Sequence, residues 1–455
     1  MKNFFLLLLA AILFTACPPT EEKEVIIIGG GLAGSATAWQ LAKAGKKVVL
    51  IEKQDSIYTS GSSKGKARIA RSSNRGDDIW SYLHNRSVKE VEALIQYLNS
   101  ADEETTYKMS DIYTTSPVTY VGRTKIYDKL YASLIRQKVD YKMATTPMKG
   151  KELFGVSLPD SVLIQREYNL HSGTINPERL IQYLHKAIQL KGGTIGYNWE
   201  VQDISKQEDR YLLNIADTKN NKTFNLVSPK IVSAAGPFTG QLLHKIAPVF
   251  KKLIQPQRVF LAFYKVKKEI FEQLSSAERQ QLFDAFPVIN SSKGTRNGSF
   301  FAMIEELDNQ GQPIFKIGGH FQRSTIKNLD QIWQQKLDEK EKKWSLDNMS
   351  RYFQLLNLPI AEEAIELVEE YSCVYSLTTT EVPYVTNIPL ENQQPNLNFI
   401  VLGGMSGVGA KGAMSYGLIG SNLLLQKTDD SPMYQQVCER LGFQRLQEDI
   451  VSLGL

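Results

Sequence analysis

The sequence predicts an α/β fold, in which a domain built on a buried parallel sheet is interleaved with an α+β domain built on a mixed sheet. Three observations support this fold class. Residues 25–52 read as a strand, a glycine-rich turn, a helix and a second strand. Residues 397–425 read again as strand, glycine-rich turn and helix, and residues 230–243 contain another strand that enters a glycine turn. Residues 246–371, by contrast, mix short strands with polar helices such as the one expected over residues 330–346.

Length and composition restrict the class of protein. The chain has 455 residues, which at roughly 100–200 residues per domain predicts two or three domains. Hydrophobic residues make up 42% and charged residues 22%, as in globular proteins. The net charge of +5 is too small for this length to favour nucleic acid, and the sequence has no basic run with interleaved aromatic residues. We expect neither a nucleic-acid partner nor a metal site.

The first residues differ from the rest of the chain. Residues 4–16 form an apolar stretch that is shorter than a transmembrane helix and has the length of a signal-peptide core. The stretch ends at Cys17, which follows the small residues Thr15 and Ala16, as in a bacterial lipoprotein signal. We therefore expect a signal over residues 1–17, lipidation of Cys17, a tether over residues 18–23, and export to the bacterial cell envelope with a membrane anchor. An ordinary signal peptide that is cleaved nearby is the alternative.

The turn after the first strand has the spacing of a dinucleotide-binding fingerprint. Gly29, Gly31 and Gly34 fill the pattern G-x-G-x-x-G between a strand and a helix. The first glycine permits a tight turn, the second lets the backbone approach a pyrophosphate, and the third allows close packing of helix on strand. Glu52 ends the second strand, where its carboxylate can accept hydrogen bonds from a ribose diol. The pattern predicts a Rossmann-like domain that binds FAD or NAD rather than NADP.

Five stretches, taken in order, resemble one family. They are VIIIGGGLAG (25–34), TSGSSKGKARIAR (59–71), FKIGGH (315–320), YSCVYSLTTTEVPYV (371–385) and GGMSGVGAKGAMSYG (403–417). The chain resembles the D-amino-acid-oxidase superfamily, and within it the monomeric sarcosine oxidase and N-methyltryptophan oxidase group. The expected organisation is a discontinuous FAD-binding domain (24–96, 165–245 and 372–427), a substrate-binding domain (97–164 and 246–371) and a C-terminal helical tail (428–455).

Two arginines in the second stretch lie three residues apart. An arginine guanidinium can bind a carboxylate through two parallel hydrogen bonds, so Arg68 and Arg71 are candidates for anion binding. The resemblance implies that Arg71 and Lys411 together bind the substrate carboxylate, and that Arg68 lies close to the flavin ring. On charge alone, a surface loop that pairs with acidic residues is the alternative.

The stretch PIFKIGGHF alternates like a strand and would place Lys316 and His320 on one face. A buried charge needs a partner or a function, whereas an exposed edge position is the alternative. The resemblance implies that Lys316 lies against the flavin and promotes its reaction with O₂, and that His320 lines the amine site. Phe300 matches a substrate-facing tyrosine of sarcosine oxidase, so the missing hydroxyl implies a different or larger substrate.

Cys373 matches the cysteine that carries the flavin in this group, through a thioether to the flavin 8α-methyl group. Two alternatives stay open. Cys373 can instead form a disulfide with Cys438, or FAD can bind without a covalent bond, as in many members of the superfamily.

The last glycine turn resembles the one that approaches the flavin in this family. Its glycines, Gly404, Gly407 and Gly409, would bring backbone close to the flavin ring, and the following helix would stabilise negative charge on the reduced ring. Ser62 and Val201 complete the residues expected to bind the cofactor.

The resemblance implies an FAD-dependent oxidation of the C–N bond of a secondary amine, or of an N-methyl or cyclic amino acid. Hydride would pass to flavin N5, and O₂ would then reoxidise the flavin and give H₂O₂. Two alternatives stay open. One is a membrane-tethered FAD dehydrogenase that passes electrons to a quinone, and the other is a lipoprotein that binds a ligand without turnover.

Overall fold

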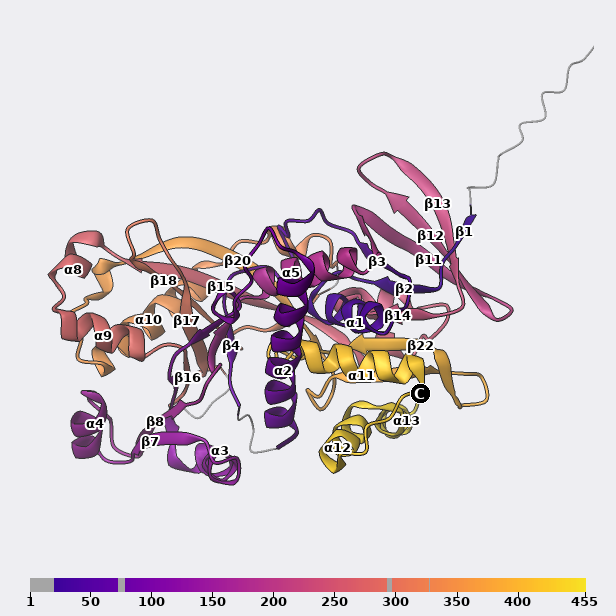
Figure 1. Cartoon of the computed structure of the whole chain (residues 1–455). Helices are drawn as coiled ribbons and strands as arrows, with labels where there is room; N and C mark the ends of the chain where they lie inside the picture. Colours follow the sequence, from indigo (N-terminus) through magenta and orange to yellow (C-terminus); the bar gives the residue numbers. More distant parts are fainter. Residues whose placement is uncertain (1–19, 73–77, 293–296, 327) are drawn as a thin grey trace, which may run out of the picture.

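The structure is a computed structural model that describes residues 20–72, 78–292, 297–326 and 328–455. The apolar stretch and Cys17, for which we expect a signal and lipidation, lie outside these residues. Figure 1 shows two lobes side by side, with the C-terminus on the underside of one of them.

The first lobe is built on a six-stranded sheet that is parallel except at one edge. In spatial order its strands are β10 (Thr194–Tyr197), β3 (Val48–Glu52), β2 (Val25–Ile28), β14 (Ile231–Ser233), β22 (Pro395–Gly403) and the antiparallel β21 (Tyr384–Pro389). β2 and β3 are fully buried apolar runs, as expected for strands covered on both faces. The predicted α/β fold class is confirmed, because strands from the start, middle and end of the chain form one sheet.

Helices that pack in the core of this sheet include α1 (Leu32–Lys43), α2 (Asp78–Ala101), α5 (Pro177–Leu190) and α11 (Ala413–Leu425). The start of α5 is fixed by Asn176, whose side chain accepts a hydrogen bond from the Arg179 N–H. α1 and α11 approach closely because Gly417 has no side chain: a Cβ there would lie 2.5 Å from the carbonyl carbon of Ala36. The helices that follow the two glycine turns are therefore held side by side.

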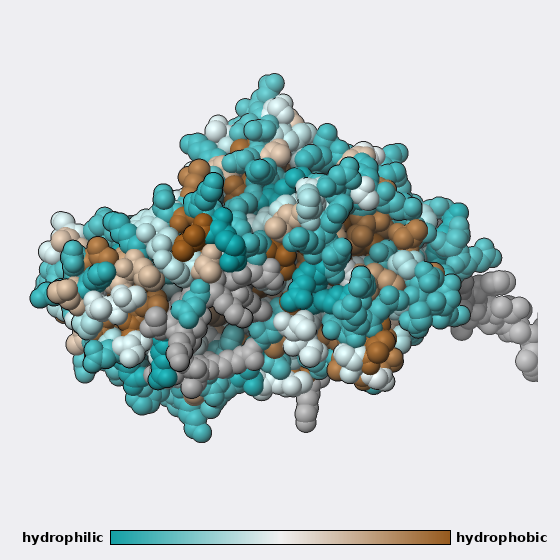
Figure 2. Space-filling model, turned by 90° about the horizontal axis from the view of Figure 1, so that it is seen from below, coloured by the Kyte–Doolittle hydropathy of each residue, from teal (hydrophilic) through white to brown (hydrophobic). Residues whose placement is uncertain are grey.

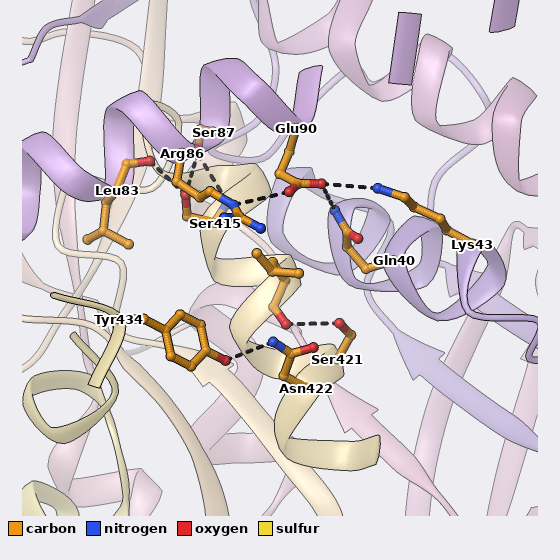
Figure 3. A network of polar contacts seen from close by, with 11 residues as sticks. Gln40, Lys43, Leu83, Arg86, Ser87, Glu90, Ser415, Ser421, Asn422 and Tyr434 are labelled. Atoms are coloured by element: carbon orange, nitrogen blue, oxygen red, sulfur yellow. Dashed lines mark hydrogen bonds and ion pairs between the residues drawn. The ribbon is translucent and has the colours of Figure 1, made fainter. Parts of the chain in front are cut away.

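A buried polar network connects α2 to α1 and α11 (Figure 3). The Glu90 carboxylate of α2 accepts hydrogen bonds from Gln40 of α1 at 2.8 Å and from Arg86 at 3.1 Å, and it lies 3.4 Å from the Lys43 ammonium. On the α11 side, the Ser415 backbone N–H donates to Ser87 Oγ at 3.1 Å. These contacts fix both helices that begin at the glycine turns against one helix.

Replacing Glu90 by alanine is expected to lower the free energy of unfolding by about 2–3 kcal/mol, because Gln40 and Arg86 lose a charged acceptor in a buried position. Glu92→Ala is the matched control on the same helix, since the Glu92 side chain is 46% exposed, and it should change stability by less than about 0.5 kcal/mol. Denaturant unfolding of the two variants measures the difference. Equal stabilities would show that the network contributes nothing beyond a surface charge.

The second lobe contains a nine-stranded mixed sheet. Its strands are β19 (Ser324–Thr325), β15 (Gln255–Val266), β18 (Pro313–Gly319), β17 (Phe300–Leu307), β16 (Val288–Ser291), β6 (Val118–Arg123), β8 (Val162–Tyr168) and β7 (Asp140–Ala144), with β20 (Ile365–Leu377) paired along β15. Five helices lie in this lobe: α3 (Thr124–Arg136), α4 (Pro147–Phe154), α8 (Lys268–Gln273), α9 (Ser276–Asp284) and α10 (Glu339–Leu355). α10 packs in a hydrophobic core on one face of the sheet, and the opposite face borders the cavity described below.

The polar helix predicted over residues 330–346 differs from the structure at its start. α10 begins only at Glu339, because Asp338 caps it and accepts a hydrogen bond from the Glu341 N–H at 2.8 Å. The polar pattern suggests a solvated helix, but not all of its charged residues are exposed. The Glu341 side chain is 2% exposed and forms an ion pair with Arg258 of β15. A charged residue can thus occupy a core position when a cation meets it from another strand.

Two small sheets and the remaining helices complete the fold. The four-stranded sheet contains β1 (Thr20–Glu22), β13 (Lys222–Ser228), β12 (Arg210–Asp217) and β11 (Trp199–Gln207), and the three-stranded sheet contains β4 (Arg68–Ala70), β9 (Gly173–Ile175) and β5 (Tyr113–Thr115). The short helices are α6 (Thr239–Leu242) and α7 (Phe250–Leu253), and the C-terminal ones are α12 (Pro432–Leu441) and α13 (Phe443–Ser452).

Some expected boundaries differ from the structure. Residues 20–22, which we expected in a tether, form β1 and pair in parallel with β13. The domain boundaries drawn between residues 164 and 165 and between 371 and 372 fall inside β8 and β20, which both belong to the second lobe's sheet. These strands cross the boundaries because pairing partners, rather than local sequence, decide where a sheet ends.

Exposed apolar side chains are scattered over the surface. Over the described ranges, no helix is both long enough and apolar enough to cross a bilayer. Exposed large hydrophobic residues such as Ile57, Leu170 and Val451 come from different parts of the chain. On the face shown in Figure 2, brown hydrophobic groups are small and separated by hydrophilic surface.

Candidate active site

Residues of both lobes line a cavity of about 1370 Å³. This exceeds the roughly 300–1,000 Å³ of most small-molecule sites, so the cavity has room for an extended ligand beside a second one. Most residues singled out from the sequence line it: Gly29, Gly31, Glu52, Ser62, Arg68, Arg71, Val201, Phe300, Lys316, His320, Cys373, Gly404, Gly407, Gly409 and Lys411. Gly34 lies buried beneath the first turn.

The first glycine turn depends on close backbone approaches. Gly29 has a φ of +100°, and a Cβ on Gly34 would lie 1.9 Å from the Gly29 carbonyl oxygen. Glu52, at the end of β3, closes the turn. Its two carboxylate oxygens accept hydrogen bonds from the N–H groups of Gly30 and Gln54, at 2.8 Å each. Burial raises the pKa of Glu52, although these hydrogen bonds oppose the shift.

A buried histidine that the sequence analysis missed supports the same turn. Ser35 Oγ donates to the Gly30 carbonyl oxygen at 2.7 Å and lies 2.9 Å from His185 Nε2, and His185 Nδ1 lies 2.8 Å from the Tyr197 hydroxyl. Because the Ser35 proton points to Gly30, Nε2 donates to Ser35 and Nδ1 accepts from Tyr197, which is the arrangement of a neutral imidazole. Burial lowers the pKa of His185 to about 4.

Acid is expected to destabilise the protein through His185. The unfolded chain holds this histidine at its ordinary pKa of 6.5 and the folded protein at about 4, so between these values only the unfolded state takes up the proton. The stabilisation is therefore complete above the unfolded pKa and falls by up to about 3 kcal/mol as the pH drops toward 4. His185→Gln should flatten this part of a profile of melting temperature against pH. His244→Gln, at an exposed histidine, should keep the parent slope; equal slopes in all three proteins would contradict the prediction.

Arg71 and Lys411, the two cations expected to clamp the substrate carboxylate, each lie beside an aromatic ring. The Arg71 guanidinium carbon is 5.4 Å from the centre of the Tyr120 ring, and Lys411 Nζ is 5.6 Å from the centre of the Trp80 ring. The Tyr120 hydroxyl donates to the fully buried Glu167 at 2.8 Å. A ring face attracts a cation and so restrains each of these two side chains at the cavity wall. The sequence analysis missed Tyr120, Trp80 and Glu167 because they lie in segments without a motif.

Lys316 of β18 meets a carboxylate that the sequence analysis also missed. Its side chain is 1% exposed, forms an ion pair with Glu305 of β17, and donates to the Ala67 carbonyl oxygen. Burial, and then the nearby Arg68, lower the pKa of Lys316 to about 8. Burial opposes the charge on Glu305, but Lys316 and Arg68 hold the pKa of Glu305 below its usual value. The two acidic residues that follow the apolar residues of FFAMIEEL were the available signal.

Strand alternation shifts the expected aromatic position by one residue. Phe301, Lys316 and Cys373 lie on the cavity face of the second lobe's sheet. Phe300, which we expected to face the substrate, borders the cavity at the start of β17 but packs in the core on the opposite face, with its ring 6.1 Å from that of Tyr352. Phe301 is thus the aromatic residue that the sheet presents beside Cys373.

Polar residues follow β18 and β20 at the same cavity. His320 comes directly after β18, and its ring lies 6.0 Å from that of Tyr375 in β20. Arg323 and Glu381, which the sequence analysis did not single out, lie 3.6 Å apart and also line the cavity. Arg68 organises the neighbouring loop, since its guanidinium donates to the Ser62 carbonyl oxygen at 3.2 Å.

Cys373 and Cys438 are both free thiols, so the structure contains no disulfide between them. Cys373 is 4% exposed on the cavity face, and its Sγ lies 3.9 Å from Ser62 Oγ. Ser62 Oγ in turn donates to the Val374 carbonyl oxygen at 2.7 Å. Cys438 lies on α12 in a different core, where burial raises its pKa to about 11. The disulfide alternative is therefore wrong for this structure.

The last glycine turn, between β22 and α11, also needs glycine. Gly404 and Gly407 have φ values of +66° and +79°. A Cβ on Gly404 would lie 2.3 Å from Thr378 Cγ2, and one on Gly407 would lie 3.1 Å from the Tyr375 ring. Backbone rather than side chain therefore forms this part of the wall, as at the first turn.

The residues present fit a dinucleotide such as FAD. The first turn leads into the N-terminus of α1, where a pyrophosphate is favoured, and the Glu52 carboxylate retains lone pairs for ribose hydroxyls beside its two backbone bonds. Val201 of β11 borders the same end of the cavity, while Cys373 and the last glycine turn border the other lobe's sheet. NAD would leave the second glycine turn without a ligand group.

Comparisons with known proteins identify the family of this chain. A family model described as "FAD dependent oxidoreductase" (DAO) matches residues 24–422. Monomeric sarcosine oxidase from Bacillus sp. (strain NS-129) is 26% identical over 239 residues, which span 51% of this chain and 56% of that protein's length. The alignment thus covers little more than half of this relative.

Solved structures share the whole fold. L-proline dehydrogenase from P. horikoshii has a TM-score of 0.68 at 15% identity, covering 94% of this chain and 99% of that chain. NikD, described as an unusual amino acid oxidase essential for nikkomycin biosynthesis, has a TM-score of 0.68 at 17% identity, covering 93% and 97%. At these identities the structures show the fold alone. The family match over most of the chain shows that this protein belongs to the FAD-dependent oxidoreductases of the DAO family and is an FAD-dependent enzyme.

Proposed function

We propose that the protein oxidises the C–N bond of an amino acid with a secondary nitrogen, either N-methylated or cyclic. The observation that carries this proposal is the position of Arg71 and Lys411 on the wall of one cavity together with both glycine turns. Cations from two distant parts of the chain, each held beside an aromatic ring, suit a substrate carboxylate.

The side chains around the cavity have distinct tasks in this proposal. FAD, when bound, supplies the hydride acceptor at flavin N5. Arg71 and Lys411 hold the substrate carboxylate. Tyr120, whose hydroxyl donates to Glu167, keeps Arg71 in place. The carbon next to nitrogen loses a hydride, and the resulting imine takes up water. An N-methyl substrate then separates into an amine and a carbonyl compound, whereas the ring of a cyclic substrate opens. No side chain is assigned as a base, because a neutral amine can lose hydride without one.

The proposal is tested by mixing the FAD-loaded protein, without oxygen, with a panel of N-methyl, cyclic and primary amino acids. Bleaching of the flavin absorbance is expected with the first two classes and not with matched amines that lack a carboxylate. If no amino acid bleaches a flavin that dithionite reduces readily, the substrate class is wrong while the family assignment stands.

We propose that Cys373 carries the flavin covalently. Its Sγ lies on the cavity face, within 3.9 Å of Ser62 Oγ and on the same side of the sheet as Lys316. Flavin should stay with the acid-precipitated parent protein and be released from Cys373→Ser. Release from both proteins would mean that FAD is bound without a covalent bond.

A second candidate differs only in the electron acceptor. In the function proposed above, the two electrons that leave the substrate pass to O₂ and give H₂O₂. In the second candidate they pass to a quinone. The buried Lys316–Glu305 ion pair favours the second, because a paired cation stabilises less negative charge on reduced oxygen than a lone one. Reoxidation rates with O₂ and with a soluble quinone compare the two directly.

The cellular location is a separate proposal. The apolar stretch before Cys17 supports export and lipid attachment at this residue. Expression of Cys17→Ser should release the protein from the membrane fraction, and unchanged fractionation would contradict the anchor.

A further inference from the structure

We propose that Glu305 is a positioning residue that controls the choice of electron acceptor, because it compensates the charge of Lys316 and restrains the reaction with O₂. The inference rests on the proposed function, which places Lys316 beside the flavin. Lys316 lines the cavity, and the Glu305 carboxylate contacts its ammonium group within the protein. The Glu305 side chain is 7% exposed, so water screens this contact little.

Glu305 reaches Lys316 because both side chains lie on the same face of the sheet. The pairing of β17 with β18 shifts between Ile304 and Glu306, so Glu305 falls at the extra residue of a bulge. Side chains alternate along a strand, so Glu305 shares the face of the residue two positions earlier. Met303, two residues earlier, is the regular partner of Lys316. The carboxylate is therefore positioned by the backbone, and this position is specific to residue 305.

The same carboxylate is fixed on its other side. It accepts hydrogen bonds from the Lys66 N–H at 2.5 Å and the Ala67 N–H at 3.2 Å. Lys316 donates to the carbonyl oxygen of the same Ala67. The loop that carries Arg68 is thus joined to β17 and β18 by one anion and one cation, and the two charges cannot separate without breaking loop contacts.

The chemical consequence concerns the first electron given to O₂. Oxygen takes two electrons and two protons from the reduced enzyme to give H₂O₂, and the first electron creates superoxide. A fixed cation stabilises this anion, whereas an ion pair presents only a dipole. A quinone takes up two electrons and two protons and becomes an uncharged hydroquinone. Its reduction therefore depends less on a nearby cation. Glu305 accordingly slows the reaction with O₂ more than the reaction with a quinone.

The test uses Glu305→Gln in the FAD-loaded protein, reduced with dithionite so that no amine substrate is needed. At a pH low enough to keep Lys316 protonated without Glu305, which supports its charge, we expect reoxidation by O₂ to become about ten- to a hundredfold faster, with little change for a soluble quinone. The affinity of the oxidised flavin for sulfite, whose adduct is an anion, should rise about tenfold by the same electrostatic cause. Adding Lys316→Met to Glu305→Gln should abolish both gains, because they need the ammonium charge.

Glu306→Gln is the matched control. Glu306 neighbours Glu305 and forms an ion pair with Lys66 of the same loop, but its side chain is 38% exposed. Parent-like rates and sulfite affinity are expected for it. Glu305→Asn, which removes the same charge, replaces Glu305→Gln if that variant fails to retain FAD.

Unchanged O₂ reoxidation and sulfite affinity in a Glu305 variant would overturn the proposal, as would equal gains in Glu306→Gln. These readouts do not involve a substrate. Failure of the amino-acid panel would therefore refute the proposed function and leave the result for Glu305 independently readable.

Discussion

Arg71→Leu is expected to raise the KM for an amino-acid substrate about a hundredfold. A charge-assisted pair between guanidinium and carboxylate contributes about 3 kcal/mol, which corresponds to that factor. Tyr120 restrains the guanidinium of Arg71 at the cavity wall, with the guanidinium carbon 5.4 Å from the ring centre. Steady-state kinetics with the substrate found by the panel measure the change, and kcat should fall less than kcat/KM.

Two comparisons separate carboxylate binding from damage to the loop. Lys66→Met, on the same loop but paired with the partly exposed Glu306, should keep the parent KM. An amine without a carboxylate should react equally poorly with the parent and with Arg71→Leu. If Arg71→Leu kept a parent-like KM, the clamp would have to be sought elsewhere in the cavity, for example at Arg323.

Gly34→Ala is expected to cost at least about 3 kcal/mol of stability and to prevent FAD binding. A Cβ at this position would lie 1.9 Å from the Gly29 carbonyl oxygen, and backbone cannot yield as a side chain does. The first turn would have to open, which would separate the N-terminus of α1 from the cavity. Flavin content after purification and the melting temperature measure both effects.

Gly45→Asn is the control for Gly34→Ala. Gly45 ends the same helix with a φ of +82° and has open space around it, and asparagine tolerates this conformation better than other residues. It should retain FAD and lose about 1 kcal/mol or less. Equal flavin loss in both variants would mean that the helix, rather than the turn, determines binding.

The parts of the site that the sequence predicts are formed by residues close to one another in the chain. A strand, a glycine turn and a helix follow one another in both binding turns, and the glycines there are required by backbone geometry that neighbours in sequence create. The carboxylate at the end of β3 belongs to the same local unit. For this reason Gly29, Gly34 and Glu52 could be assigned before the structure was known.

The parts that were missed depend on pairing between distant segments. Glu305 meets Lys316 only because β17 and β18 pair in one particular register, and no periodicity in the sequence reveals that register. The same limit shifted the aromatic position from Phe301 to Phe300, since strand faces alternate at every residue. His185 reaches Ser35 because α5 packs against α1, and the sequence of neither helix reveals which of their residues meet.

The order of strands in the six-stranded sheet has a consequence for how the protein acquires its native state. β2, from the beginning of the chain, pairs with β14 from beyond its middle, and β14 pairs with β22 near its end. The ribosome must therefore release almost the whole chain before this sheet can close. Until then the buried strand β14 lacks β22 on one side, so we expect slow maturation, a strong dependence on chaperones, and cofactor uptake only after synthesis is complete.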